Sequence, residues 1–104
     1  MRVFKPTEIE GTTEYSGLVK FIVNDSPDYS IGDFLIKKGD ALGPESHAND
    51  ETFYVIKGKV LVDDIANNRT VTVNEGEIFV MSAGEEHRAH TDTEAFVLWF
   101  QGKK

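Results

Sequence analysis

Short runs of apolar and β-branched residues recur along the chain, and clusters of Gly, Pro, Asn, Asp and Ser separate them. Short runs between turn-forming residues are typical of strands. No segment has the apolar spacing of a convincing amphipathic helix. The pattern therefore predicts an all-β protein, a closed barrel or a sandwich, with about eight strands. The expected strands span residues 18–23, 30–37, 52–57, 59–62, 70–73, 77–81, 86–91 and 95–101.

Turn-forming residues predict how these strands are connected. Gly58 lies between the third and fourth runs, where a missing side chain permits a positive φ. Two strands are therefore expected to meet there at a sharp change of direction. Residues 38–44 contain two glycines and a proline and are predicted to form a loop. Residues 1–15 are mostly polar and are expected to form an arm that pairs with a sheet edge or with a neighbouring subunit.

Side chains alternate between the two faces of a strand, so their parity indicates which residues face the interior. Phe53 and Val55 share one parity and are predicted to line the cavity or the core, whereas Tyr54 and Ile56 face the other way. The last run, which contains Trp99, is apolar at both parities. Both of its faces are predicted to be buried, in the barrel or under a subunit interface.

The composition is that of a globular protein. With 104 residues, the chain 1–104 is expected to form a single domain. Apolar residues make up 39% of it and aromatic residues 11%, which suits a folded core. The 11 Lys and Arg against 18 Asp and Glu give a formal charge of −7, which repels phosphate backbones and anionic membranes. Neither nucleic acid nor a membrane is therefore expected as a partner.

The lack of cysteine limits the possible chemistry, and the lack of a signal peptide or membrane-spanning segment limits the expected location. The sequence contains no cysteine, which excludes disulfides, thiolate metal sites and cysteine nucleophiles, so any metal must use nitrogen or oxygen ligands. The N-terminus lacks the apolar core of a signal peptide, and the longest apolar run, residues 95–100, is too short to span a bilayer. We therefore expect a cytoplasmic protein.

Potential metal ligands cluster in one segment. Glu45, His47 and Glu51 lie close together, and His87 follows later in the chain. Glu45 and His47 are two residues apart, so on a strand they point the same way and both can reach one ion. Neighbouring strands inside a barrel can bring Glu51 and His87 to the same ion, because carboxylates and imidazoles bind divalent metals at about 2.0–2.2 Å. His47, Glu51 and His87 form a 2-His-1-carboxylate set, the ligand type of non-haem Fe(II) oxygenases.

Glu45 has three alternative roles in this hypothesis. As a fourth ligand it would neutralise the ion together with Glu51 and favour Mn or Fe over copper. As a neighbour of the ion it could act as a general base. As a residue that has replaced a former ligand, it would indicate a barrel that no longer binds a metal ion. His90 lies at odd spacing from His87, so it is expected to face the opposite side, at the surface. Asp63 is expected to be a solvated charge at a strand end.

Around these residues the sequence resembles the two motifs of the cupin superfamily. The first motif runs glycine, five residues, His-x-His, three or four residues, glutamate, six residues, glycine. Residues 39–58 match it, with Glu45 in place of the first histidine. The second motif runs glycine, five residues, proline, x, glycine, two residues, histidine, three residues, asparagine. Residues 76–91 match it, with Ser82 and Thr91 in place of the proline and the asparagine.

The resemblance implies a small, single-domain jelly-roll β-barrel with a metal ion held inside by three histidines and one glutamate. His47, Glu51 and His87 occupy three of these four ligand positions, and Glu45 occupies that of the first histidine. The identity of the divalent ion, among Fe, Mn, Zn and Ni, stays open. The resemblance also implies a homodimer, and a two-fold dimer is the commonest closed oligomer.

Three functions remain open. The first is a dioxygenase-type, non-haem-metal enzyme acting on a small molecule inside the barrel, in which His47, Glu51 and His87 hold the metal and Glu45 tunes or completes the site. The second is an Mn- or Zn-dependent isomerase, lyase or hydrolase of a sugar or small acid. The third is a non-catalytic barrel that binds or senses a small ligand. Fold alone does not decide among them, because one barrel hosts many chemistries.

Overall fold

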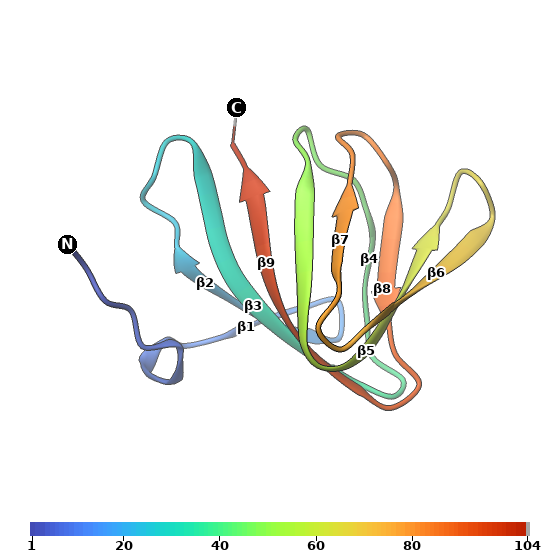
Figure 1. Ribbon diagram of the computed structural model, residues 1–104, viewed down its shortest axis with the longest axis horizontal. Coiled ribbons are helices and arrows are strands. Elements are labelled where there is room, and N and C mark those ends of the chain that lie inside the picture. The colour runs from blue at the N-terminus through green and yellow to red at the C-terminus, as the bar shows by residue number, and fades with distance from the viewer. Residues whose placement is uncertain (104) are drawn as a thin grey trace.

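The computed structural model describes residues 1–103 and confirms the predicted all-β jelly-roll barrel, which is nearly closed (Figure 1). Within these residues the chain forms one short 3-10 helix and no α-helix, and none of its helices is long and apolar enough to cross a membrane. In chain order, the elements are η1 (Pro6–Glu8), β1 (Thr12–Glu14), β2 (Gly17–Val23), β3 (Tyr29–Lys37), β4 (Ala41–Glu45), β5 (Glu51–Asp64), β6 (Arg69–Asn74), β7 (Ile78–Met81), β8 (His87–His90) and β9 (Glu94–Gly102).

The strands form two antiparallel sheets that share β5. The first sheet has the order β1-β2-β3-β9-β5, and β7 pairs with the same half of β5. The second sheet is made of β4, β8, the other half of β5, and β6. The long strand β5 therefore passes from one sheet into the other, which is visible as its bend in Figure 1. The two sheets enclose a single apolar core between them.

Gly58 is the point at which β5 changes sheets. Its φ is +79°, and a Cβ atom at this position would lie 2.0 Å from the Glu94 carbonyl oxygen. Only glycine satisfies both the backbone conformation and this close approach. The change of direction predicted at Gly58 is therefore confirmed, but the expected break between two strands is absent, since β5 is continuous from Glu51 to Asp64.

Strand β4 corrects the prediction of a loop over residues 38–44. Leu42 is buried and pairs with Ala89 of β8, so packing and ladder hydrogen bonds outweigh the turn preference of the local sequence. The register shifts between Leu42 and Glu45, where Gly43 has a φ of +109°. A Cβ atom on Gly43 would lie 2.7 Å from the His87 carbonyl oxygen, so glycine allows β4 and β8 to approach closely.

Inward and outward positions follow the predicted alternation. Phe53 and Val55 are buried, whereas Tyr54 and Ile56 are exposed. On the last strand, Trp99 is buried in the barrel, whereas Phe100 on the outer face is 45% exposed, so burial of this face stays a prediction that depends on a subunit interface. The buried apolar residues of the core are Val19, Phe34, Ile36, Leu42, Phe53, Val55, Val60, Val62, Val73, Met81, Ala89, Ala95, Val97 and Trp99.

The N-terminal arm lies against the first sheet and also reaches the second. Its strand β1 pairs with β2, the edge expected for this segment. The Tyr15 hydroxyl then donates a 2.8 Å hydrogen bond to the Pro44 carbonyl oxygen on β4. The Ser16 Oγ atom accepts a 2.7 Å hydrogen bond from the Ala41 N–H group. The turn after β1 therefore bridges the two sheets and helps to close the barrel.

Candidate metal centre

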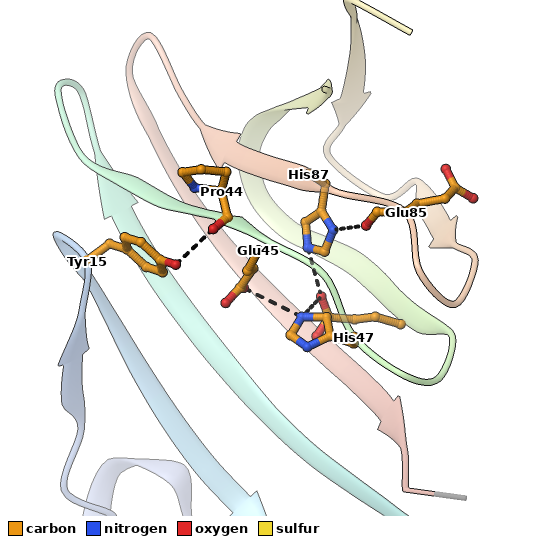
Figure 2. Close-up of polar contacts among 7 residues, drawn as sticks. Tyr15, Pro44, Glu45, His47, Glu85 and His87 are labelled. Carbon is orange, nitrogen blue, oxygen red and sulfur yellow. Dashed lines mark hydrogen bonds and ion pairs between the residues drawn. The ribbon is translucent and has the colours of Figure 1, made fainter. Parts of the chain in front are cut away.

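The four candidate ligands converge on one cavity inside the barrel. Glu45 ends β4, His47 lies in the loop that follows, Glu51 begins β5 and His87 begins β8. Glu45 and His87 are cross-strand partners, so they lie on the same face of the second sheet. The predicted strand alternation does not place His47, because β4 has already ended, but its ring still points into the cavity beside Glu45 (Figure 2).

The donor atoms of Glu45, His47 and His87 are spaced as one ion would require, and Glu51 lies beside the two histidines. The His47 Nε2 atom lies 3.6 Å from both Glu45 Oε1 and Glu51 Oε1. The His87 Nε2 atom also lies 3.6 Å from Glu51 Oε1. One ligand atom each from Glu45, His47 and His87 falls within 4.8 Å of the others. These distances are too long for good hydrogen bonds, but they suit atoms that share a central ion.

The residues fit a divalent metal ion on a second ground. The Nε2 atoms of His47 and His87 are both buried, and neither has a hydrogen-bond partner among the described residues. A buried polar nitrogen without a partner carries a desolvation cost that a bound ion would remove. Imidazole nitrogens with carboxylate oxygens are also the donor set that transition metals accept.

A backbone carbonyl orients the His87 ring. The Nδ1 atom of His87 lies 3.1 Å from the Glu85 carbonyl oxygen (Figure 2). A carbonyl oxygen only accepts hydrogen bonds, so Nδ1 carries the proton of the neutral ring and Nε2 presents its lone pair to the cavity. This is the arrangement that metal-binding histidines commonly use, with the second ring nitrogen bonded to a carbonyl or carboxylate.

The loop that carries His47 is held by the turn that precedes β8. The Gly84 N–H group donates a 2.8 Å hydrogen bond to the His47 carbonyl oxygen. The Asp50 carboxylate accepts a 2.9 Å hydrogen bond from the Ala83 N–H group. Gly84 has a φ of +82°, the left-handed conformation that glycine adopts without strain. The two ligand-bearing segments are thus fixed to each other through their backbones.

Burial and charge oppose each other in setting the pKa of His87 and act together in setting that of Glu14. Burial of His87 opposes its protonation, but the Glu51 carboxylate and the Glu85 carbonyl outweigh burial and raise the pKa of His87 above its ordinary value. A carboxylate that the sequence analysis missed, Glu14 of β1, also lines the cavity. Burial, and then the negative charge of Glu45, raise the pKa of Glu14. Only the fold could reveal Glu14, because it lies far from both motifs in the sequence.

The rest of the cavity is mainly apolar and includes four aromatic rings. Phe21 and Trp99 meet edge to face with ring centroids 5.1 Å apart, and Phe34 and Phe53 do the same at 5.1 Å. The Trp99 indole N–H donates a 3.1 Å hydrogen bond to the Asp33 carbonyl oxygen, which fixes that ring. The lining residues besides the four candidate ligands are Glu14, Val19, Phe21, Phe34, Leu42, Phe53, Ala89, Trp99 and Gln101.

His90 lies outside this site, as its spacing from His87 predicts. Its Nε2 atom is 3.0 Å from Asp63 Oδ1 on the outer face of the second sheet. Asp63, expected to be a solvated charge, also accepts hydrogen bonds from Arg88 at 3.1 Å and Thr70 at 2.6 Å. These contacts outweigh partial burial and lower the pKa of Asp63. These four residues form a network of hydrogen bonds and ion pairs that joins β5, β6 and β8.

Thr91, one of the departures from the second motif, has a structural role. It is buried just beyond β8, and its hydroxyl donates a 2.8 Å hydrogen bond to the Lys59 carbonyl oxygen on β5. The other departure, Ser82, begins the turn that leads to His87, where its N–H group donates to the Glu85 carboxylate at 2.9 Å. Neither side chain lines the cavity.

Comparisons with known proteins agree with this architecture. Residues 32–100, more than half of the chain, match the family model described as Cupin domain. No curated protein matches the chain.

Among solved structures, the chain is similar to the polyketide cyclase RemF from Streptomyces resistomycificus, with a TM-score of 0.87 and 17% identity over 100% of this chain and 80% of that one. It is also similar to KdgF from Halomonas sp., with a TM-score of 0.81 and 18% identity over 100% of this chain and 94% of that one. An RmlC-like cupin from Shewanella frigidimarina has a TM-score of 0.81 and 14% identity over 100% of this chain and 93% of that one. At these identities the likeness shows the fold.

Proposed function

The chain belongs to the cupin family, and on that premise we propose that it is a metal-dependent enzyme that acts on a small molecule inside the barrel. The observation that carries this proposal is the pair of buried, unpartnered Nε2 atoms of His47 and His87, which face the Glu45 and Glu51 carboxylates. The cavity beside them is lined mainly by apolar and aromatic side chains, which suit an organic molecule next to the ion.

His47, Glu51 and His87 would hold the ion, and Glu45 would either complete its coordination or act beside it as a general base. Two carboxylates neutralise a divalent charge, so this donor set favours Fe, Mn, Zn or Ni over softer ions. The contact of Nδ1 with the Glu85 carbonyl keeps the His87 ring in the tautomer that a ligand needs. The apolar wall around the cavity excludes water from the reacting molecule.

Dioxygenase-type chemistry is the first reaction class that this site supports. Two histidines and one carboxylate leave open positions on an ion, and an iron ion in such a set supplies oxygen activation. In this case Glu45 serves as the base that removes a proton from the bound molecule, since its carboxylate lies beside His47 and stays partly accessible, with 33% of its side chain exposed.

Lewis-acid chemistry is the second candidate, and the position of Glu45 favours it. Glu45 lies in the same group of donor atoms as His47 and His87, and Glu51 Oε1 lies 3.6 Å from both histidine Nε2 atoms. Coordination by Glu45 would therefore leave fewer open positions on the ion. A Zn or Mn ion held in this way supplies polarisation of a carbonyl or hydroxyl group, as an isomerase, lyase or hydrolase requires.

Turnover with and without oxygen tests the enzyme proposal and separates the two classes. Protein loaded with Fe(II), Mn(II) or Zn(II) is incubated with a panel of small hydroxylated molecules in air and under argon, and products are identified by mass spectrometry. Turnover with iron in air alone supports the dioxygenase class, whereas turnover under argon supports the Lewis-acid class. The matched His87→Ala protein should give no product. Tight ligand binding without product in either atmosphere would favour a binding or sensing barrel.

We also propose that the protein is a homodimer formed through the outer face of its first sheet. Tyr54, Ile78, Val80 and Phe100 lie on this face and are all exposed, and cross-strand pairing makes them neighbours on β5, β7 and β9. A contiguous apolar face of this kind marks an interaction surface. A second copy is the occupant to which a two-fold axis would bring an identical face.

A further inference from the structure

The N-terminal arm places a third carboxylate, that of Glu14, at the cavity beside the candidate ligands. Glu14 pairs with Gly17 across a two-residue turn in which Tyr15 has a φ of 52°, an uncommon conformation for a bulky residue. The Tyr15 hydroxyl is bonded to the Pro44 carbonyl oxygen, one residue before Glu45 (Figure 2). This contact holds Glu14 against the ligand-bearing strand β4.

No structural partner explains the position of the Glu14 carboxylate. Among residues 1–103 it takes part in no hydrogen bond and no ion pair. The neighbouring arm residues, by contrast, are bonded to β4, since the Ser16 N–H group donates to the Ala41 carbonyl oxygen at 3.2 Å. The arm is therefore anchored by other contacts, and the Glu14 carboxylate is left available to a bound molecule.

The cavity has an unbalanced charge. Its lining contains the carboxylates of Glu14, Glu45 and Glu51, and among the described residues no Lys or Arg lines it. A divalent ion would neutralise Glu45 and Glu51, and the charge of Glu14 would remain. Because no Lys or Arg side chain offsets this charge, an anionic group on a bound molecule would be repelled.

The opposite wall of the cavity is suited to a ring. Phe21 of β2, Phe34 of β3, Phe53 of β5 and Trp99 of β9 belong to the first sheet, as do Glu14 and Glu51, whereas Glu45 and His87 belong to the second. Aromatic side chains in edge-to-face pairs leave ring faces and edges available to a flat apolar molecule. A bound molecule would therefore place its ring against these aromatic side chains and its polar groups toward the carboxylates.

We propose that Glu14 is a specificity-determining residue, which makes the cavity select uncharged, ring-bearing molecules with hydroxyl groups and reject their carboxylate-bearing analogues. The hydroxyl groups would donate hydrogen bonds to the acidic side, because a carboxylate accepts but does not donate. This inference rests on the proposed function for the position of the ion, and it narrows the substrate from sugars and small acids to neutral cyclic molecules.

The test compares two probes of similar size, neutral 4-hydroxybenzyl alcohol and anionic 4-hydroxybenzoate. Their Kd values are measured by calorimetry at pH 8 on Zn-loaded wild-type protein, Glu14→Gln and the control Glu10→Gln, which alters an exposed residue of the same arm. Wild-type protein should bind the alcohol more tightly. Removing the Glu14 charge should lower the selectivity ratio about tenfold, mainly by tightening 4-hydroxybenzoate, and Glu10→Gln should leave the ratio unchanged. Zn content is measured on every sample.

Each result has a defined meaning. An unchanged ratio in Glu14→Gln, a wild-type preference for 4-hydroxybenzoate, or no binding of either probe at millimolar concentration would overturn the inference. A sample that holds no Zn would contradict the proposed function instead. The Kd values of the two probes, measured on that metal-free protein, would still decide the role of Glu14. Without the ion, the carboxylates of the cavity repel 4-hydroxybenzoate more strongly. Normal Zn content in Glu14→Gln would show that its effect does not arise from a disrupted metal site.

Discussion

The Tyr15 hydroxyl donates a 2.8 Å hydrogen bond to the Pro44 carbonyl oxygen and thereby ties the N-terminal arm to the strand that ends in Glu45. Tyr15→Phe removes this bond and keeps the ring. We expect the free energy of unfolding in urea to fall by about 1 kcal/mol, and amide exchange to rise over residues 12–16. Metal content should not change, because neither residue is a candidate ligand. Unaltered exchange in the arm would contradict the anchoring role of Tyr15.

The raised pKa of His87 predicts a pH dependence of stability in the metal-free protein. Since the folded pKa lies above the unfolded value of about 6.5, the protonated ring stabilises the fold fully below that pH, and this contribution is lost as pH rises through the folded pKa. The difference in unfolding free energy between wild type and His87→Gln should therefore shrink from pH 5 to pH 9. A difference that stays constant or grows across this range would contradict the prediction.

The outer-face network around Asp63 should support stability without affecting the site. The lowered pKa of Asp63 means that its contribution is present above the ordinary carboxyl pKa of about 3.9 and is lost as pH falls through the folded pKa. Asp63→Asn should cost roughly 1–2 kcal/mol of unfolding free energy at pH 7 and less at pH 3. Asp92→Asn, which removes an exposed pair with Lys59, is the matched control and should cost less. An equal loss in both proteins would contradict this role.

The exposed apolar face of the first sheet should determine the oligomeric state. Val80 on β7 belongs to that face and is 56% exposed, so Val80→Asp would place a charge inside the proposed two-fold interface. Light scattering coupled to gel filtration should give a dimer for wild type and a monomer for Val80→Asp. Val3→Asp, on the exposed N-terminal segment, should remain a dimer. A monomeric wild type at micromolar concentration would disprove the proposed interface.

Much of the fold follows from sequence alternation, because inward apolar positions such as Phe53 and Val55 alternate with outward ones along β5. Strand β4 could not be predicted in the same way, because its Gly43 and Pro44 are residues that favour turns, and only pairing with β8 makes the segment a strand. Gly58 indicated the change of direction, but the continuity of β5 depends on its partners in both sheets.

The candidate ligands could be proposed from spacing, yet the contacts that orient them could not. The Glu85 carbonyl that fixes the His87 tautomer is a backbone group. Every residue has such a group, so the sequence does not indicate which carbonyl makes the contact. Glu14 reaches the cavity because the arm folds back and pairs with β2. The local sequence does not predict this tertiary contact. Similarly, the bond between Asp63 and His90 joins strands that lie far apart in the sequence.

The metal content of the purified protein tests the central claim most directly. Elemental analysis is made on untagged wild type, His47→Ala and Glu45→Ala, each purified without chelator and then incubated with Fe, Mn, Ni and Zn in turn. We predict close to one ion per wild-type chain and its loss in His47→Ala. Loss of the ion in Glu45→Ala would identify Glu45 as a ligand, and retention would show that it acts beside the ion or is not needed to hold it. A wild-type protein that remains empty with all four metals would contradict the proposed metal centre.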